Sequence, residues 1–171
     1  MSNIEVAAHQ LTDIIKRYNA DFIEARLEES HTSHITYRGK QMESVGQSIA
    51  GGGSVRALVK GGWGFVSFND FREISRRVEQ TVQQARLANN KESHLAPLVP
   101  VSDKVVGEAD RNPLSISLVR KKELLDEYND IIWRTPKLQT SIIGYGDSHR
   151  QVIYLNSSGS YIEQKRADIM L

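Results

Sequence analysis

Six of the chain's twelve glycines lie in residues 48–68, which read SIAGGGSVRALVKGGWGFVSF. A glycine-rich segment binds phosphate when its glycines open a helix, because the free amides and the helix dipole then point at the anion. Here the triplet at 51–53 leads into SVRALV, which alternates like a strand, and neither GxGxxG nor GxxxxGK[ST] spacing is present. The stretch therefore predicts a bent β-sheet and disfavours a nucleotide-binding enzyme.

The glycines have two expected structural roles. A turn is predicted at residues 61–62, and a bulge or close backbone approach at 51–53. A strand with so little side-chain cover is also able to pair with an extended peptide. Trp63 lies between two glycines, so its ring packs on residues 90–113 or faces another domain. The candidate contacts for a peptide or partner are Gly51, Gly52, Gly53, Arg56 and Trp63.

Three segments have the apolar spacing of an amphipathic helix. Residues 4–18 form the first, preceded by the S-x-x-E capping pair Ser2 and Glu5. The second runs from about 71 to 87 behind a D-x-x-E cap that begins at Asp70. The third covers 118–132 and ends before Pro136.

Strand patterns fill most of the remainder. Residues 22–28 alternate, EESHTS is predicted to turn, and HITYRGKQMESV gives two strands around a tight turn at Arg38-Gly39-Lys40. The tail alternates over 138–145, 151–155 and 161–171, with GDSH and NSSGS as separators. The predicted fold class is α+β (α/β), made of antiparallel β-meanders with helices packed on one face.

The two halves of the chain share a residue pattern. Ser30, His31 and Ile35 recur as Ser148, His149 and Ile153 at one offset. After a two-residue insertion, Gly39, Met42 and Glu43 correspond to Gly159, Ile162 and Glu163. The pattern predicts a duplicated helix-plus-meander unit. The expected sub-units are 1–89 and 114–171, joined by a crossing segment at 90–113 that has room for a short strand of its own.

Composition limits the classes of partner. Lys and Arg total 22 against 21 acidic residues, so the net charge of +1 does not favour nucleic acid. The chain has no cysteine, which excludes disulfides and thiolate metal sites. The N-terminus lacks a cationic start and an apolar segment, and no run approaches the ~20 apolar residues that span a bilayer. A cytoplasmic protein with no membrane partner is expected.

No catalytic or metal-binding residue can be assigned from the sequence. None of the five histidines stands in HExxH, and His31 and His34 lie on opposite faces of a strand. His31 and His149 are interpreted as exposed residues at hairpin ends. The sequence offers no partner that would shift the pKa of the carboxylates at 28–29, 43 and 126–127, so they are interpreted as surface charge.

Taken together, four stretches resemble the N-terminal domain of the TldD/PmbA family, with the TldD branch nearer. They are DFIEARLEESHTSHITYRGKQMESV, GGGSVRALVKGGWGFVSFND, NPLSISLVRKKELL and YLNSSGSYIEQKR. The resemblance covers the whole chain, and GGGSVRALVKGGWGF is its most specific part. It implies a cytoplasmic zinc metallopeptidase, historically named a modulator of DNA gyrase, in which TldD and TldE (PmbA) subunits form a hetero-oligomer around a cavity that admits unfolded peptides for proteolysis.

The family's zinc motif, HExxxH, lies C-terminal to this region, and the chain ends at Leu171 without it. The resemblance therefore implies a fragment without its own cofactor, inactive as a hydrolase alone, with zinc in the parent's C-terminal region. Its expected partners are its own C-terminal domain, a TldE/PmbA-type subunit and the unfolded peptide substrate. The alternatives are a stand-alone peptide-binding or scaffold domain and, third, a nucleotide-binding enzyme.

Overall fold

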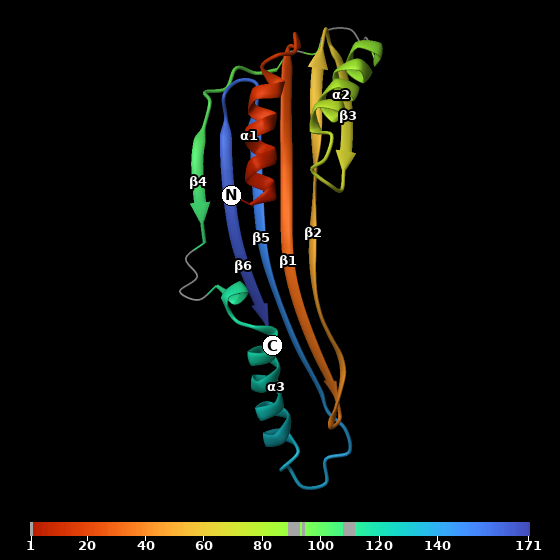
Figure 1. Cartoon of the computed structure of the whole chain (residues 1–171), viewed down its shortest axis with the longest axis vertical. Helices are drawn as coiled ribbons and strands as arrows, with labels where there is room; N and C mark the ends of the chain where they lie inside the picture. The colour runs from red at the N-terminus through yellow and green to blue at the C-terminus, as the bar shows by residue number, and fades with distance from the viewer. Residues whose placement is uncertain (1, 89–92, 94, 108–111) are drawn as a thin grey trace. The chain divides into compact units, whose positions relative to one another are not determined.

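The computed structural model describes residues 2–88, 93, 95–107 and 112–171. Ten elements follow one another along these residues (Figure 1). In chain order they are α1 (Asn3–Ile15), β1 (Phe22–Arg38), β2 (Gln41–Val59), β3 (Gly62–Phe68), α2 (Ile74–Ala88), β4 (Ser102–Val106), the 3-10 turn η1 (Pro113–Ser115), α3 (Leu118–Ile132), β5 (Ile142–Asn156) and β6 (Tyr161–Met170).

The strands form one six-stranded sheet in the order β3-β2-β1-β5-β6-β4. β2 and β3 pair antiparallel, from Gly53 opposite Phe68 to Val59 opposite Gly62. β4 pairs parallel to β6, so the sheet is mixed rather than built only of antiparallel meanders. The α+β fold class predicted from the sequence is confirmed.

Packing divides the chain into two compact units. Unit 1 comprises residues 1–29, 50–106 and 151–165. In its core, the apolar faces of α1 and α2 cover the side chains that point inward from β1, β2 and β5. The largest fully buried members include Ile4, Leu11, Leu27, Val78 and Ile153. Burying each such side chain contributes about 1.5–3 kcal/mol, so this unit has a substantial core.

Unit 2 comprises residues 30–49, 107–150 and 166–171. Its core is smaller: Leu125 of α3 packs with Ile35 and Tyr37 of β1 and with Ile143 and Tyr145 of β5. In each unit the helices therefore cover one face of the sheet. Among the described residues, no helix is long and apolar enough to cross a membrane.

The long strands differ from the expected short ones. β1 continues through EESHTS, and β5 continues through GDSH, where turns were predicted. These segments are polar on both faces, so they lack the apolar alternation that marks a strand, and the pairing with neighbouring strands keeps them extended. His31 and His149 consequently lie within strands and are half-buried, so their interpretation as exposed hairpin-end residues was wrong.

The helix caps and the turn between β2 and β3 agree only in part with the sequence predictions. The capping box of Ser2 and Glu5 is confirmed. The cap predicted at Asp70 is wrong, because α2 begins only at Ile74, and the Asp70 carboxylate instead accepts a hydrogen bond from the amide of Arg72. The hairpin between β2 and β3 turns at Lys60-Gly61, one residue earlier than predicted. Both residues have positive φ, +48° and +82°, as a two-residue type I′ turn requires.

The crossing segment at 90–113 includes residues 90–92, 94 and 108–111, which lie outside the described residues. Its expected short strand exists as β4. The duplication remains a prediction: the order helix–strand–strand occurs twice, and the matched turn glycines Gly39 and Gly159 both have positive φ. The sub-unit boundaries 1–89 and 114–171 also remain predictions, and the compact units follow other boundaries, since each is assembled from separate segments.

Candidate functional site

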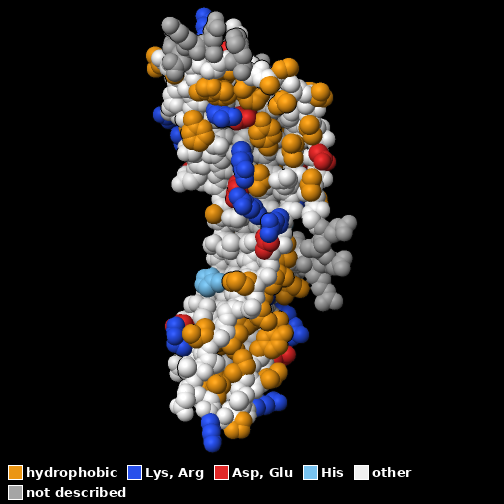
Figure 2. Space-filling view, turned by 180° about the vertical axis from the view of Figure 1, so that it is seen from behind, with side chains coloured by type: hydrophobic (Ala, Val, Ile, Leu, Met, Phe, Trp, Pro, Cys, Tyr) orange, Lys and Arg blue, Asp and Glu red, His pale blue; other side chains and the backbone are white. Residues whose placement is uncertain are grey.

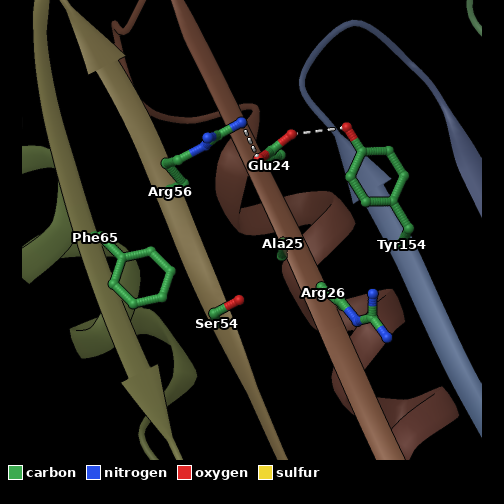
Figure 3. Close-up of a pocket in the computed structure, with 7 residues that line it drawn as sticks. All are labelled: Glu24, Ala25, Arg26, Ser54, Arg56, Phe65 and Tyr154. Atoms are coloured by element: carbon green, nitrogen blue, oxygen red, sulfur yellow. Dashed lines mark hydrogen bonds and ion pairs between the residues drawn. The ribbon is translucent and has the colours of Figure 1, made fainter.

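The sheet of unit 1 has one face that α1 and α2 leave uncovered, here called the outer face. Along β1, the inward residues Ile23, Ala25 and Leu27 alternate with outward ones. Figure 3 shows the outward side chains in front of the sheet and helical ribbon behind it. The outer face carries Glu24, Arg26, Ser54, Arg56, Trp63, Phe65 and Tyr154.

Glu24 is the centre of a polar network on this face. One carboxylate oxygen accepts from Arg56 of β2 at 2.7 Å, and the other accepts from the hydroxyl of Tyr154 of β5 at 2.8 Å (Figure 3). Asn156 donates to that hydroxyl at 3.3 Å. Burial raises the pKa of Tyr154, so the hydroxyl keeps its proton and remains a donor to Glu24. The network holds three neighbouring strands in register.

Arg56 also contacts Trp63, which stands on β3. The guanidinium lies over the indole ring at 4.6 Å from its centroid, a cation–π contact. The ion pair with Glu24 and the stacking on Trp63 together fix the direction of the Arg56 side chain. Trp63 thus packs on its own sheet.

A pocket of about 240 Å³ opens beside this network. Its lining includes Arg26 and the Ser54 hydroxyl, between the rings of Phe65 and Tyr154. Phe65 is 57% exposed, which is unusual for a phenylalanine. Figure 2 looks onto the opposite side from Figure 1. Over unit 1 it shows a line of basic and acidic side chains with hydrophobic side chains next to it. The face is amphipathic.

The glycine triplet has a packing role. A Cβ at Gly53 would lie 2.6 Å from the carbonyl oxygen of Arg26, and one at Gly52 would lie 2.4 Å from that of Phe68. Real side chains do not fit so close to backbone, so the predicted close approach is found. Gly53 pairs with Phe68 of β3. Of the three glycines, only Gly51 and Gly52 therefore lie outside the pairing between β2 and β3.

The structure brings together two of the five sequence-predicted contact residues, Arg56 and Trp63, while none of the three glycines lines the pocket. Three residues of the face, Glu24, Arg26 and Tyr154, were not predicted from the sequence. Glu24 and Arg26 occupy alternating outward positions of a predicted strand, so the alternation along that strand could have identified them. Tyr154 lies 130 residues from Glu24 in the chain, so no local pattern joins them.

Unit 1 also has a hollow of about 410 Å³ between α1 and α2. It is lined by Gln10, Asp13, Ile14, Arg17, Phe71, Glu73, Ile74 and Ser75.

On the inward side of the sheet, Glu163 binds Lys104 at 3.2 Å and Lys165 at 3.1 Å, and accepts from Gln151 at 3.0 Å. Burial would raise the pKa of Glu163, but the two lysines outweigh it and hold that pKa below its usual range. The Glu163 carboxylate is thus already paired with neighbouring side chains of its own unit.

Unit 2 buries an ion pair. Lys121 of α3 lies 2.6 Å from Asp147 of β5, with the two side chains 4% and 0% exposed. Lys121 also donates to the Ser33 hydroxyl at 3.2 Å, and the hydroxyl of Tyr145 donates to Asp147 at 2.6 Å. Burial, followed by the hydrogen bond to the Asp147 carboxylate, raises the pKa of Tyr145. The groups are closed off from solvent, so their role is to fix α3 on the strands of its unit.

The zinc that the resemblance implies would need several His, Cys, Asp or Glu side chains close together. In the part of the chain that the structure describes, no group of three His, Cys, Asp or Glu side chains is placed to hold an ion. The described residues therefore do not fit a zinc centre.

Comparisons with known proteins identify relatives over most of the chain. Residues 23–88 match the family model described as PmbA/TldA metallopeptidase domain 1. A metalloprotease of Synechocystis sp. is 39% identical over 166 residues, which cover 95% of this chain and 36% of that protein. A metalloprotease of Methanocaldococcus jannaschii is 28% identical and covers 84% of this chain and 33% of its own length. The chain thus spans about a third of these relatives.

Solved structures share the fold. A protein proposed to modulate a DNA gyrase, from Thermotoga maritima, superposes with a TM-score of 0.72 at 11% identity and covers 96% of this chain. TldE from Thermococcus kodakarensis gives a TM-score of 0.71 at 16% identity and covers 95%. In both cases the match occupies 38% of the solved chain. The chain is therefore similar to the first domain of the PmbA/TldD metallopeptidase family, whose model it matches over residues 23–88.

Proposed function

We propose that the chain is the non-catalytic first domain of a TldD-like zinc metallopeptidase, in which the outer face of unit 1 contacts a peptide or the partner subunit. One observation carries the proposal: 95% of this chain matches a metalloprotease, yet the match occupies only 36% of that protein. The HExxxH motif that the family uses for zinc is absent from these 171 residues. Metal chemistry would then belong to the remaining two-thirds of the longer protein.

The composition of the outer face supports a contact role. Tryptophan, tyrosine and arginine are the residues that most often carry binding energy at protein interfaces, and phenylalanine is enriched there. Here all four types stand on one uncovered sheet face, and Phe65 projects with more than half of its surface exposed. Arg56 and Glu24 are already held in place, so a ligand meets an ordered surface and little conformational entropy is lost on binding.

The further details follow from the family. The whole protein would work in the cytoplasm, pair with a TldE/PmbA-type subunit and cleave unfolded peptides, with this domain forming part of the chamber wall. The TldD branch remains the expected assignment. The gyrase-modulator name receives no support from charge, since a net charge of +1 does not favour DNA binding.

Metal content and hydrolysis test the proposal. The purified 171-residue chain is expected to hold no stoichiometric zinc after dialysis and to leave an unstructured fluorogenic peptide intact. The protein extended by the downstream coding sequence is expected to hold about one zinc per chain and to cleave that peptide once its partner subunit is added. Mass-spectrometric metal analysis and the peptide assay provide the readouts. One tightly held zinc per 171-residue chain, or hydrolysis by that chain alone, would refute the assignment.

A further inference from the structure

We infer that the outer-face pocket of unit 1 binds a carboxylate carried by an extended peptide, and that Arg26 is the cation that receives it. The inference rests on the proposed function, because it assigns a ligand chemistry to the same surface. The reason is that some charged groups of the pocket already neutralise one another, while Arg26 is held only by a weak pair.

Arg56 and Glu24 neutralise each other. Both oxygens of Glu24 are engaged, one by Arg56 at 2.7 Å and the other by Tyr154 at 2.8 Å. Arg56 is further held by its stacking on Trp63. These two residues form a fixed wall of the pocket with no net charge.

Arg26 supplies the remaining charge. It forms an ion pair with Glu28 at 3.5 Å, and the two side chains are 56% and 36% exposed. A pair of this length and exposure contributes little free energy, so a ligand can replace it at small cost. A guanidinium presents two parallel N–H donors that match the two oxygens of a carboxylate. The lining of the pocket therefore carries one positive charge ready for an anion.

The other walls suit an amino-acid residue that carries a carboxylate. The Ser54 side chain lines the pocket, and its hydroxyl is a second donor for a carboxylate. The rings of Phe65 and Tyr154 provide apolar contact for the carbon atoms of the ligand. At about 240 Å³, the pocket is smaller than the 300–1,000 Å³ typical of drug-sized ligands and matches a single residue.

The charge balance favours a carboxylate over phosphate or nucleic acid. A single arginine matches a single negative charge, whereas the second charge of a dianion would find no free cation in the lining, because Arg56 is already paired with Glu24. Two peptide groups have this chemistry, the C-terminal carboxylate and the side chain of Asp or Glu. The experiment separates them.

One unstructured peptide sequence is prepared in three forms: with a free C-terminus, with an amidated C-terminus, and amidated with one internal glutamate. Fluorescence anisotropy measures the Kd of each for the 171-residue chain. The amidated form without glutamate is expected to bind weakly through backbone and aromatic contacts, and at least one carboxylate form about tenfold more tightly, as a charge-assisted hydrogen bond of about 1.5–3 kcal/mol implies. The form that gains affinity identifies the source of the carboxylate.

The Arg26→Gln variant is expected to remove that tenfold gain and to leave the Kd of the amidated form unchanged. Arg26→Lys should restore part of the gain, because it returns the charge without the paired donors. Arg166→Gln is the matched control, since Arg166 is another exposed arginine paired with a nearby acid, Asp168. Its Kd values should equal those of the unchanged chain. Amide spectra of each variant confirm that the fold is retained.

Equal affinity of all three peptide forms for the unchanged chain would overturn the carboxylate assignment while leaving peptide contact intact. A gain that survives Arg26→Gln would overturn the role of Arg26. Absence of binding by every form would instead refute peptide contact as part of the proposed function, and the inference with it.

Discussion

Replacement of Asp147 by alanine is expected to lower the free energy of unfolding of unit 2 by about 3–5 kcal/mol. The substitution leaves Lys121 buried at 4% exposure without its counter-charge, and it removes the acceptor of the Tyr145 hydroxyl. An unpaired charge in an apolar interior costs more than the pair contributed, because desolvation is no longer offset. Urea unfolding followed by Trp133 fluorescence in a Trp63→Phe background reports on the surroundings of Trp133, which lies in unit 2, whereas Trp63 lies in unit 1.

Two further variants distinguish charge burial from simple truncation. Asp168→Ala breaks the exposed pair with Arg166 in the same unit, and its cost is expected to stay below about 1 kcal/mol. The double variant Lys121→Met/Asp147→Leu should recover most of the stability lost by Asp147→Ala, because no charge is then left buried. A cost for Asp147→Ala equal to that of Asp168→Ala would show that the buried pair does not support α3.

Replacement of Gly64 by alanine is expected to destabilise unit 1 by about 3 kcal/mol, at the upper end of the range for overpacking. A Cβ at this position would lie 2.0 Å from the carbonyl oxygen of Thr81 and 2.7 Å from the amide of Ala85. Both are backbone atoms of α2, so no side-chain rotation relieves the clash and β3 must separate from the helix. Urea unfolding followed by Trp63 fluorescence in a Trp133→Phe background measures the loss.

Gly144→Ala is the matched control, because it places the same methyl group on a strand glycine with nothing within 4 Å of the new Cβ. Gly144 lies in unit 2, so its effect is followed by Trp133 fluorescence in the Trp63→Phe background. Its effect should be neutral or stabilising by about 0.4–1 kcal/mol through reduced freedom of the unfolded chain. Equal stability changes for the two glycines would show that contact between β3 and α2 is looser than described.

Periodicity predicted the elements whose apolar residues repeat within one segment. The stripe of α1, the capping box at Ser2 and the turn at Gly39 are all local patterns of this kind, and all are confirmed. The continuous strands through EESHTS and GDSH were not predictable in the same way. Their residues carry no apolar alternation, and their extended shape depends on pairing with strands that are distant in the chain.

The candidate site shows the same limit more strongly. Arg56 and Trp63 were selected because they lie in the glycine-rich stretch, and they prove to stack on one another. The acid that completes the network, Glu24, comes from another strand, and Tyr154 comes from the far half of the chain. Lys121 and Asp147 likewise meet only through the packing of α3 on β5. Such pairs are set by tertiary contacts, which one sequence does not specify.

The central claim is that the outer face of unit 1 is the contact surface of this domain. Titration of the isotope-labelled 171-residue chain with an unlabelled unstructured peptide, followed by amide and indole chemical shifts, tests it most directly. The shifts are expected to concentrate on outward positions of β2 and β3, including the Trp63 indole N–H, while Trp133 in unit 2 stays unchanged. Shifts confined to the hollow between α1 and α2, or to unit 2, would contradict the claim.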